Sequence, residues 1–324
     1  IDKYGKDRTA VCCLSSLNLE NYDEWKDEPG FIEDIMRFLD NVLTDFINRA
    51  PESFDDAKYS AMRERSVGLG VMGFHSFMQK NMIPIESVMA KVWNKKMFQL
   101  IDKEVNAASK KLAEERGPCP DAAEYGINER FSNKTAIAPT ASISIICGGA
   151  SPGIEPIAAN SYTHKTLSGS FNVRNKYLRK ILQKYNQDTN EVWSSITTNQ
   201  GSVDHLDFLS QDEKDVFKTA FEIDQRWLID HSADRTPYIS QAQSLNVFIP
   251  ADIHKKELHQ IHYQAWKKGL KSLYYCRSKS IQRAEVVNNS FAKTKKQKNQ
   301  EKQQTTDYEE CLSCLLYTSP SPRD

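Results

Sequence analysis

The most informative stretch of this chain is the run AIAPTASIS at residues 136–144, followed closely by GIEP at residues 153–156. A strand-forming apolar segment stops at Pro139 and gives way to small hydroxyl-bearing residues. This composition is typical of a strand that leads into a turn or helix start with unpaired backbone N–H groups. Such amides, beside the hydroxyls of Thr140 and Ser142, predict a phosphate site. The same residues are equally typical of an ordinary turn or cap, so that alternative stays open.

Composition and charge restrict the class of protein. The 324 residues are enough for one large domain or two smaller ones. The 43 basic side chains balance 43 acidic ones, so no overall field favours nucleic acid or an anionic membrane as a partner. No apolar run approaches the length of a membrane span, which favours a cytoplasmic protein. Seven cysteines without the spacing of a disulfide framework favour a reducing compartment.

Apolar periodicity predicts helices separated by short strands. Ser210 and Glu213 form a capping-box pattern at the start of one helix, and Asp252 is expected to cap another. The expected helices are 31–49, 97–116, 210–231 and 252–268, and the expected strands are 10–19, 135–140 and 270–276. Strands spaced by helices predict an α/β fold with a largely parallel sheet.

Two further patterns are not interpreted as sites. Residues 68–73 (GLGVMG) match GxGxxG, but no convincing strand precedes them and no acidic residue stands at the usual distance, so close helix packing is predicted. His254, His259 and His262 are expected on one helix, but no two of them are four residues apart. This spacing favours surface side chains over metal ligands.

The sequence changes character near residue 286. From there it is polar and charged, which predicts a disordered linker that leads to a CxxC pair, Cys311 and Cys314. The last residues, 315–324, resemble a translated sequencing adaptor, and the start at Ile1 predicts that further sequence precedes the chain. The expected organisation is 1–285 for the folded part, 286–314 for a flexible tail and 315–324 for non-native residues.

Three motifs, in this order, resemble the large subunit of class I ribonucleotide reductase. They are AVCCLSSLNL at 10–19, the loop at 136–144 and KSLYY at 271–275. With the cysteine pair near the end, the likeness extends over most of residues 1–314. It implies the C-terminal half of the family's ten-stranded α/β barrel, and the reduction of ribonucleoside diphosphates to deoxyribonucleoside diphosphates for DNA precursor synthesis.

The resemblance also implies where the substrate binds. The substrate diphosphate is expected at Pro139, Thr140, Ala141, Ser142 and Ile143, held partly by backbone amides.

The reducing thiols and the radical path are implied in the same way. Cys12 is expected to be one of two thiols that supply electrons by closing to a disulfide, with its partner upstream of residue 1. Tyr274 and Tyr275 are expected to relay a radical toward a cysteine that also lies upstream. Taken alone, a strand cysteine is more often a small buried hydrophobe, as expected for Cys13, and adjacent aromatics are more often packing residues.

The tail pair Cys311 and Cys314 is expected to re-reduce the spent disulfide and then to be reduced by thioredoxin or glutaredoxin. A CxxC can also be half of a zinc site, but no second pair follows, so no metal site is predicted. The family expects a cysteine near position 314, which favours Cys314 as a native residue.

The implied partners complete the expectation. A separate small subunit with a metal centre would generate the radical, so no cofactor is expected on this chain. ATP and deoxynucleotide effectors would bind upstream, and the large subunits would form a homodimer. The helix at 252–268 lies where the family receives the small subunit's C-terminal peptide, although simple packing is as typical. Neither nucleic acid nor a membrane is expected as a partner, and the chain alone is expected to be inactive.

Two alternatives remain at this stage. A cobalamin-dependent class II reductase would generate its radical without a small subunit, and the tyrosine pair argues against it. A non-catalytic module that binds a phosphate ligand and carries redox-sensitive thiols would bind nucleotide without dithiol exchange.

Overall fold

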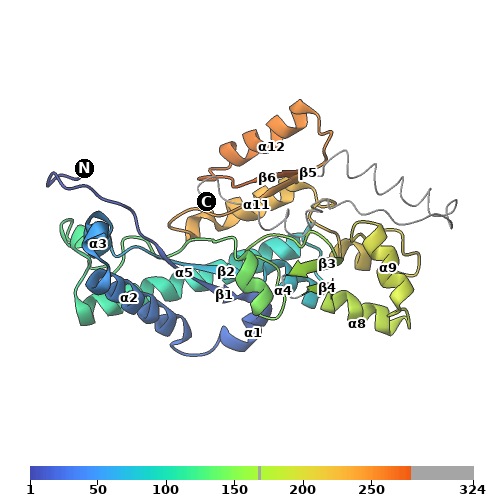
Figure 1. The fold of residues 1–324 in the computed structure, drawn as a ribbon, viewed down its shortest axis with the longest axis horizontal. Helices are drawn as coiled ribbons and strands as arrows, with labels where there is room; N and C mark the ends of the chain where they lie inside the picture. The colour runs from blue at the N-terminus through green and yellow to red at the C-terminus, as the bar shows by residue number, and fades with distance from the viewer. Residues whose placement is uncertain (167–168, 279–324) are drawn as a thin grey trace, which may run out of the picture.

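A computed structural model describes residues 1–166 and 169–278 of the chain (Figure 1). The elements in chain order are β1 (Cys13–Asn18), η1 (Leu19–Asn21), α1 (Tyr22–Trp25), α2 (Phe31–Arg49), η2 (Glu52–Phe54), α3 (Asp55–Glu64), β2 (Val67–Met72), α4 (Phe74–Lys80), α5 (Val88–Arg116), α6 (Pro120–Ala123), α7 (Ala141–Ile146), β3 (Ser161–Thr166), β4 (Gly169–Arg174), α8 (Lys176–Lys184), α9 (Asn190–Thr198), α10 (Gln211–Val216), α11 (Gln225–Arg235), η3 (Thr236–Tyr238), β5 (Val247–Ile249), α12 (Lys255–Lys267) and β6 (Cys276–Ser278).

Parallel strands joined by helical crossovers form the centre of the fold. β1 pairs in parallel with β2, from Cys13 opposite Val67 to Asn18 opposite Met72. Parallel bridges then join Leu69 to Thr135 and residue 137 to residue 243, and β5 pairs in parallel with β6. Helices lie between β1 and β2 and between β5 and β6, as parallel crossovers require, so the predicted α/β fold with a largely parallel sheet is confirmed.

Successive residues of β2 point alternately to the face of the sheet that packs on the main core and to the opposite face. Val67, Leu69 and Val71 are buried in the main apolar core with residues of α2, α4 and α5. In Figure 1 α2 and α5 lie close together on the left, and the two helices pack against each other. Gly68 and Gly70 lie between these core residues in β2 and face the opposite way.

The prediction of close helix packing at residues 68–73 was wrong, because these glycines lie in and just after strand β2. A Cβ on Gly70 would stand 2.2 Å from the carbonyl oxygen of Ala136 on the neighbouring segment. A Cβ on Gly68 would meet Leu14, Ala136 and the sulfur of Cys12. The glycines therefore admit a close neighbouring strand and are not a nucleotide fingerprint.

We expect Gly70→Ala to lower the free energy of unfolding by about 3 kcal/mol, because a backbone carbonyl must move to admit the new methyl group. Gly126→Ala is the control: Gly126 has a φ of 68° and nothing within 4 Å of its would-be Cβ. That change should cost only about 1 kcal/mol of backbone strain. Urea unfolding measures both losses, and equal losses would show that the close contact at Gly70 carries no cost.

A second, smaller core lies away from the parallel strands. Its apolar residues come from α8, α9, α10 and the segment between α9 and α10, with Trp193 the largest buried side chain. The antiparallel hairpin β3–β4 leads into this region, which lies at one end of the molecule in Figure 1.

Several predicted boundaries moved in the structure. Helix 31–49 is confirmed as α2, whereas 97–116 is the second part of α5, which begins at residue 88. The predicted helix 210–231 is wrong: the capping box of Ser210 and Glu213 is present, but α10 ends at Val216. α11 starts anew with Asp224 as its side-chain cap. The Asp224 carboxylate therefore caps a new helix, although residues 210–231 contain no proline or glycine that would signal a break.

The last predicted helix is shorter than expected, and so is the first predicted strand, of which β1 forms only Cys13–Asn18. The strand predicted at 270–276 was wrong, because β6 begins only at Cys276. His254, and not Asp252, caps α12 by accepting a hydrogen bond from the Lys256 amide. Residues 135–140 contribute isolated bridges instead of a continuous strand. The expected tail at 286–314 and the expected adaptor residues at 315–324 lie outside the described residues. Within the described part of the chain, no helix has the length and apolar character needed to cross a bilayer.

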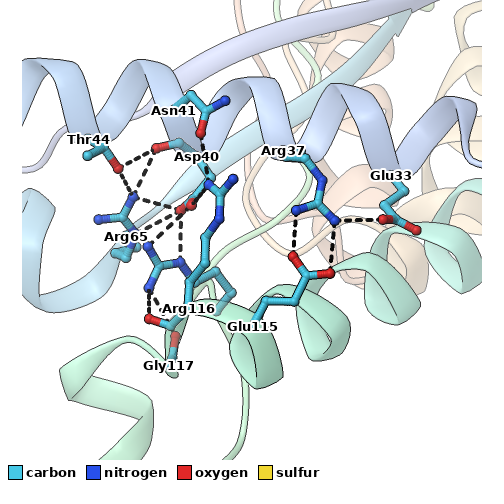
Figure 2. A network of polar contacts seen from close by, with 10 residues as sticks. Glu33, Arg37, Asp40, Asn41, Thr44, Arg65, Glu115, Arg116 and Gly117 are labelled. Carbon is cyan, nitrogen blue, oxygen red and sulfur yellow. Dashed lines mark hydrogen bonds and ion pairs between the residues drawn. The ribbon is translucent and has the colours of Figure 1, made fainter.

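A buried carboxylate ties the helices on one side of the sheet together (Figure 2). Asp40 on α2 accepts hydrogen bonds from Arg65 after α3, from Arg116 at the end of α5, and from Arg130. The guanidinium of Arg130 also donates to the carbonyl of Gly117. Four segments that are distant in sequence therefore meet at one fully buried side chain.

Candidate functional site

The predicted phosphate loop is a tight turn into a short helix. Thr140 has a φ of 53°, a left-handed conformation that is uncommon for a β-branched residue, and its side chain is buried. Its hydroxyl oxygen accepts a hydrogen bond of 2.7 Å from the Gly153 amide. The next residues begin α7, where Ser142 and Ile143 are exposed. The first amides of a helix have no partner within the helix, so this turn presents N–H groups at an open surface.

The segment after α7 anchors this turn to the end of β2. Ser151 and Ser76 exchange hydrogen bonds between their hydroxyls and backbone amides, at 3.1 and 2.8 Å. The carbonyl of Ser151 also accepts from the amide of Gly73, which directly follows β2. Gly153 passes so close to the carbonyl of Ala138 that a Cβ would stand 3.1 Å from it. The loop at 139–143 is therefore packed against residues 151–153, which are themselves hydrogen-bonded to the segment that follows β2.

The tyrosine pair directly precedes β6. The ring centroids of Tyr274 and Tyr275 are 4.1 Å apart, with the rings tilted by 50°. Tyr274 is 47% exposed, whereas Tyr275 is partly buried. A hydrogen bond with the Tyr275 side chain, followed by partial burial, raises the pKa of Tyr274. The guanidinium of Arg277 on β6 lies over the Tyr275 ring, 5.5 Å from its centroid.

A buried Glu–Asn pair joins the loop and the tyrosine pair. Glu155 accepts hydrogen bonds of 3.0 Å from both the backbone amide and the side-chain amide of Asn246. The side-chain oxygen of Asn246 in turn accepts from the backbone amide of Tyr275. Sequence reasoning singled out the motif that contains Glu155 without giving it a role and did not find Asn246. The one available signal was a carboxylate within an otherwise apolar motif.

The environment of Glu155 changes its acidity. Burial raises the pKa of this carboxyl to about 7, against an ordinary value of 4.5, although the two Asn246 donors and the charge of Arg277 act in the opposite direction. Between these two pH values the folded protein holds a proton that the unfolded chain has released. Below the lower value both states are protonated, so the group then contributes nothing to the pH dependence.

We therefore expect the free energy of unfolding to fall as pH rises from 4.5 to 7, by roughly 3 kcal/mol from Glu155 alone. Other groups titrate in this range, so the measurement is the difference between wild type and Glu155→Gln in urea unfolding at several pH values. The wild type should lose more stability than the variant across this range. Parallel curves for the two proteins would contradict the expectation.

Cys12 lies immediately before β1, on the side of the sheet that Gly68 faces. Its sulfur accepts a hydrogen bond of 3.1 Å from the side-chain amide of Gln241, which also donates to the carbonyl of Val67. Part of the Cys12 side chain reaches the surface, but desolvation by the surrounding chain raises the pKa of the thiol, against the hydrogen bonds from Gln241 and Ser66. Cys12 is therefore largely a protonated thiol at neutral pH.

The remaining predicted residues are Cys13, the three histidines near α12 and the cysteine pair of the tail. Cys13 packs against the main core, in agreement with the structural role predicted for it. His254, His259 and His262 are exposed on or next to α12, and within residues 1–166 and 169–278 no group of side chains is arranged to hold a metal ion. Cys311 and Cys314 lie outside the described residues.

The chain is similar to proteins of one known family. The family described as "Ribonucleotide reductase, barrel domain" matches residues 2–125 and 120–276. The ribonucleoside-diphosphate reductase large subunit of Invertebrate iridescent virus 6 is 52% identical over 287 residues, which are 87% of this chain and 30% of that protein. The putative large subunit of Frog virus 3 is 42% identical over 84% of this chain and 48% of that protein.

A solved structure shows the same similarity in three dimensions. The alpha subunit of the class Id ribonucleotide reductase of Actinobacillus ureae matches with a TM-score of 0.78 and 39% sequence identity. The match covers 85% of this chain and 51% of that subunit. The chain therefore spans about half, or less, of the length of the proteins that it matches.

Proposed function

Because the chain belongs to the ribonucleotide reductase barrel family, we propose that it is part of the large subunit of a class I ribonucleoside-diphosphate reductase. The complete enzyme would reduce ribonucleoside diphosphates to deoxyribonucleoside diphosphates. The observation that carries this proposal is the junction of the Thr140 turn and the tyrosine pair through residues 153–155 and Asn246. A site for an anionic substrate and a pair of oxidisable phenols are thereby held in one rigid arrangement.

We assign the substrate diphosphate to the turn formed by Pro139, Thr140, Ala141, Ser142 and Ile143. The amides at the start of α7 supply hydrogen-bond donors of the kind that phosphate oxygens accept. The Thr140 hydroxyl is used by Gly153, so its part is to hold the turn in its left-handed form. The exposed Ser142 hydroxyl is available to the ligand.

We assign the reducing equivalents to Cys12 and a second thiol elsewhere in the complete subunit. Loss of the 2′-hydroxyl of the substrate as water requires two electrons and two protons, and two thiols release both when they close to a disulfide. A thiol that is protonated at neutral pH, as the environment of Cys12 dictates, can supply such a proton. Cys311 and Cys314 would then reduce that disulfide and be restored by thioredoxin or glutaredoxin.

We assign radical transfer to Tyr274 and Tyr275. Two phenols in ring contact can pass an electron and a proton in steps, and the exposed Tyr274 is on the side from which a partner can be reached. The radical would come from a metal-containing small subunit. We further propose a homodimer of large subunits in the cytoplasm, with ATP and deoxynucleotide effectors bound outside the described residues.

The proposed function is tested with the complete subunit that carries this sequence. Conversion of a ribonucleoside diphosphate to its deoxy form is assayed with dithiol and either the small subunit or cobalamin. Turnover that requires the small subunit supports the class I assignment. Turnover with cobalamin alone would move the protein to class II, and nucleotide binding without turnover under either condition would favour a binding module.

We expect Cys12→Ser to reduce steady-state turnover to the background of the assay, because serine cannot close a disulfide. The substrate should still bind with nearly wild-type affinity, since the turn at 139–143 is untouched. Cys147→Ser is the matched control, because Cys147 is also exposed and has no assigned role. Steady-state turnover by Cys12→Ser at the wild-type rate would contradict the assignment.

A further inference from the structure

The two tyrosines are consecutive in sequence and yet lie on the same side. In an extended strand consecutive side chains point to opposite faces. The ring contact of Tyr274 and Tyr275 therefore requires a local departure from strand geometry just before β6. Such departures commonly re-aim a side chain next to an active site.

The backbone hydrogen bonds show where this departure lies. The amide of Tyr274 donates to the carbonyl of Leu245, and the amide of Val247 donates to the carbonyl of Tyr275. In a regular parallel ladder one and the same residue would use its amide and its carbonyl for these two bonds. Here the two bonds fall on consecutive residues, so one extra residue is inserted and the Tyr275 amide leaves the ladder.

Asn246 and Glu155 satisfy the amide that the bulge displaces. The Tyr275 amide donates to the side-chain oxygen of Asn246 at 3.0 Å. That oxygen can face Tyr275 only if the NH₂ group of Asn246 faces the other way, and there it donates to Glu155. A second bond, from the Asn246 backbone amide to the other carboxylate oxygen, fixes the carboxylate itself. Glu155 is only 4% exposed, so water does not replace these bonds.

We propose that Glu155 is a positioning residue for the radical relay, acting through Asn246 to hold the Tyr275 backbone in the bulge that brings the two phenols together. This inference rests on the proposed function, because it is the relay that requires the contact between the rings. Glu155 touches neither substrate nor phenol, and its effect reaches the reaction only through the orientation of the Asn246 amide.

The position of Glu155 in the chain adds a second consequence. Two residues earlier, the Gly153 amide is bound to the Thr140 hydroxyl in the predicted phosphate turn. The short segment 153–155 therefore contacts the substrate turn at one end and the support of the tyrosine pair at the other. The relay and the substrate turn are in this way set in a fixed relation to each other.

Each hydrogen bond from Glu155 to Tyr275 has a fixed donor and a fixed acceptor, so exchanging a donor for an acceptor tests the proposal. In Glu155→Gln the side-chain oxygen can still accept from the Asn246 backbone, but its NH₂ group then faces the NH₂ group of Asn246. If Asn246 turns its amide over to relieve this clash, its NH₂ group faces the Tyr275 amide instead. Either way two donors oppose each other within the chain of hydrogen bonds that holds the Tyr275 backbone.

A second substitution restores the order of donors and acceptors. In the double variant Glu155→Gln with Asn246→Asp, the new carboxylate at position 246 accepts from both the glutamine NH₂ group and the Tyr275 amide. The shape of both side chains is nearly unchanged. The double variant should therefore regain the activity that the single variant loses, an outcome that general damage to the fold would not produce.

The experiment measures turnover of the complete subunit with its small subunit, for wild type, Glu155→Gln, the double variant and Glu104→Gln, a control whose side chain is 42% exposed. We expect kcat of Glu155→Gln to fall about tenfold to a hundredfold with KM for the nucleotide unchanged, as displaced reacting groups cause. The double variant should recover most of this loss, and the control should match wild type.

Each result decides the matter. Wild-type kcat in Glu155→Gln, or a folded double variant that stays as slow as the single one, would overturn the positioning role and leave the proposed function intact. An inactive wild-type enzyme would instead contradict the proposed function. If Glu155→Gln does not fold, the double variant decides alone: near-wild-type kcat supports the proposal, and a folded but inactive protein overturns it.

Discussion

Replacing Asp40 by asparagine is expected to lower the free energy of unfolding by about 3–5 kcal/mol, because the change leaves the buried Arg65 and the partly buried Arg130 without their common counter-charge. The carboxylate is fully buried, and Arg65 and Arg130 each donate to it at 2.9 Å. An asparagine would also present an NH₂ group to guanidinium donors. Since Arg65 is itself buried, its charge could not be compensated by water.

The titration of Asp40 agrees with the direction of this effect. Burial alone would raise the pKa of Asp40, but the hydrogen bond from Arg130 and the charge of Arg65 outweigh it and hold the pKa below its ordinary value. The stability from this carboxylate is therefore fully present above the unfolded pKa and is lost as pH falls through the folded pKa.

The measurement is urea unfolding of Asp40→Asn and of Asp45→Asn at neutral pH. Asp45 is on the same helix, five residues further on, but its side chain is 62% exposed and pairs with Arg49, which is itself exposed. Asp45→Asn should change the stability by less than about 0.5 kcal/mol, as exposed pairs contribute little. A similar small loss for Asp40→Asn would show that the buried cluster does not hold the helices together.

The sequence predicted local structure well where one face of an element meets the core. The helix at 31–49 was found with its full bounds, because its apolar residues recur at helical spacing and pack against α5. The parallel α/β fold and the family were also confirmed. For the helix, the deciding interactions are repeated along the segment itself, so they leave a periodic pattern. The family followed instead from the resemblance of three motifs.

Contacts between distant segments could not be predicted in this way. The glycines of β2 were assigned to helix packing because nothing local shows that Ala136 lies against Gly70. Asp40 stands 76 residues from Arg116, and Glu155 stands 91 residues from Asn246. Such pairs depend on how the crossovers bring strands together, and a single sequence carries no periodic signal for them.

The site residues also divide into those that sequence motifs identified and those that only the folded structure brings together. Motif likeness singled out Thr140, Cys12 and the tyrosine pair, and their roles stay predictions until they are tested. The structure adds Asn246 and shows that the segment 153–155, which the sequence singled out without a role, connects the Thr140 turn to Tyr275 through it. Neither a buried asparagine nor a lone glutamate is unusual in sequence, so only the folded geometry assigns them a place in the site.

Tyr275→Phe is expected to abolish turnover with the small subunit. The substitution keeps the ring that contacts Tyr274 and lies under Arg277, so packing is preserved. It removes the phenolic O–H, and with it the group that can lose an electron and a proton together. Substrate binding at 139–143 should persist, because the hydrogen bond with Asn246 uses the Tyr275 backbone amide and not its hydroxyl.

Tyr125→Phe is the matched control, because Tyr125 is 78% exposed and lies far along the chain from the relay. It should turn over at the wild-type rate. Both variants should unfold at the wild-type urea concentration, which separates a loss of radical transfer from a loss of structure.

The most direct test of the account is the deoxynucleotide formed in the first turnover by the complete subunit with its small subunit, before any disulfide needs to be reduced. We expect product from wild type and Tyr125→Phe and none from Tyr275→Phe, with substrate bound equally by all three. Product from Tyr275→Phe at the wild-type level would contradict the central claim that this chain carries the radical path to the substrate.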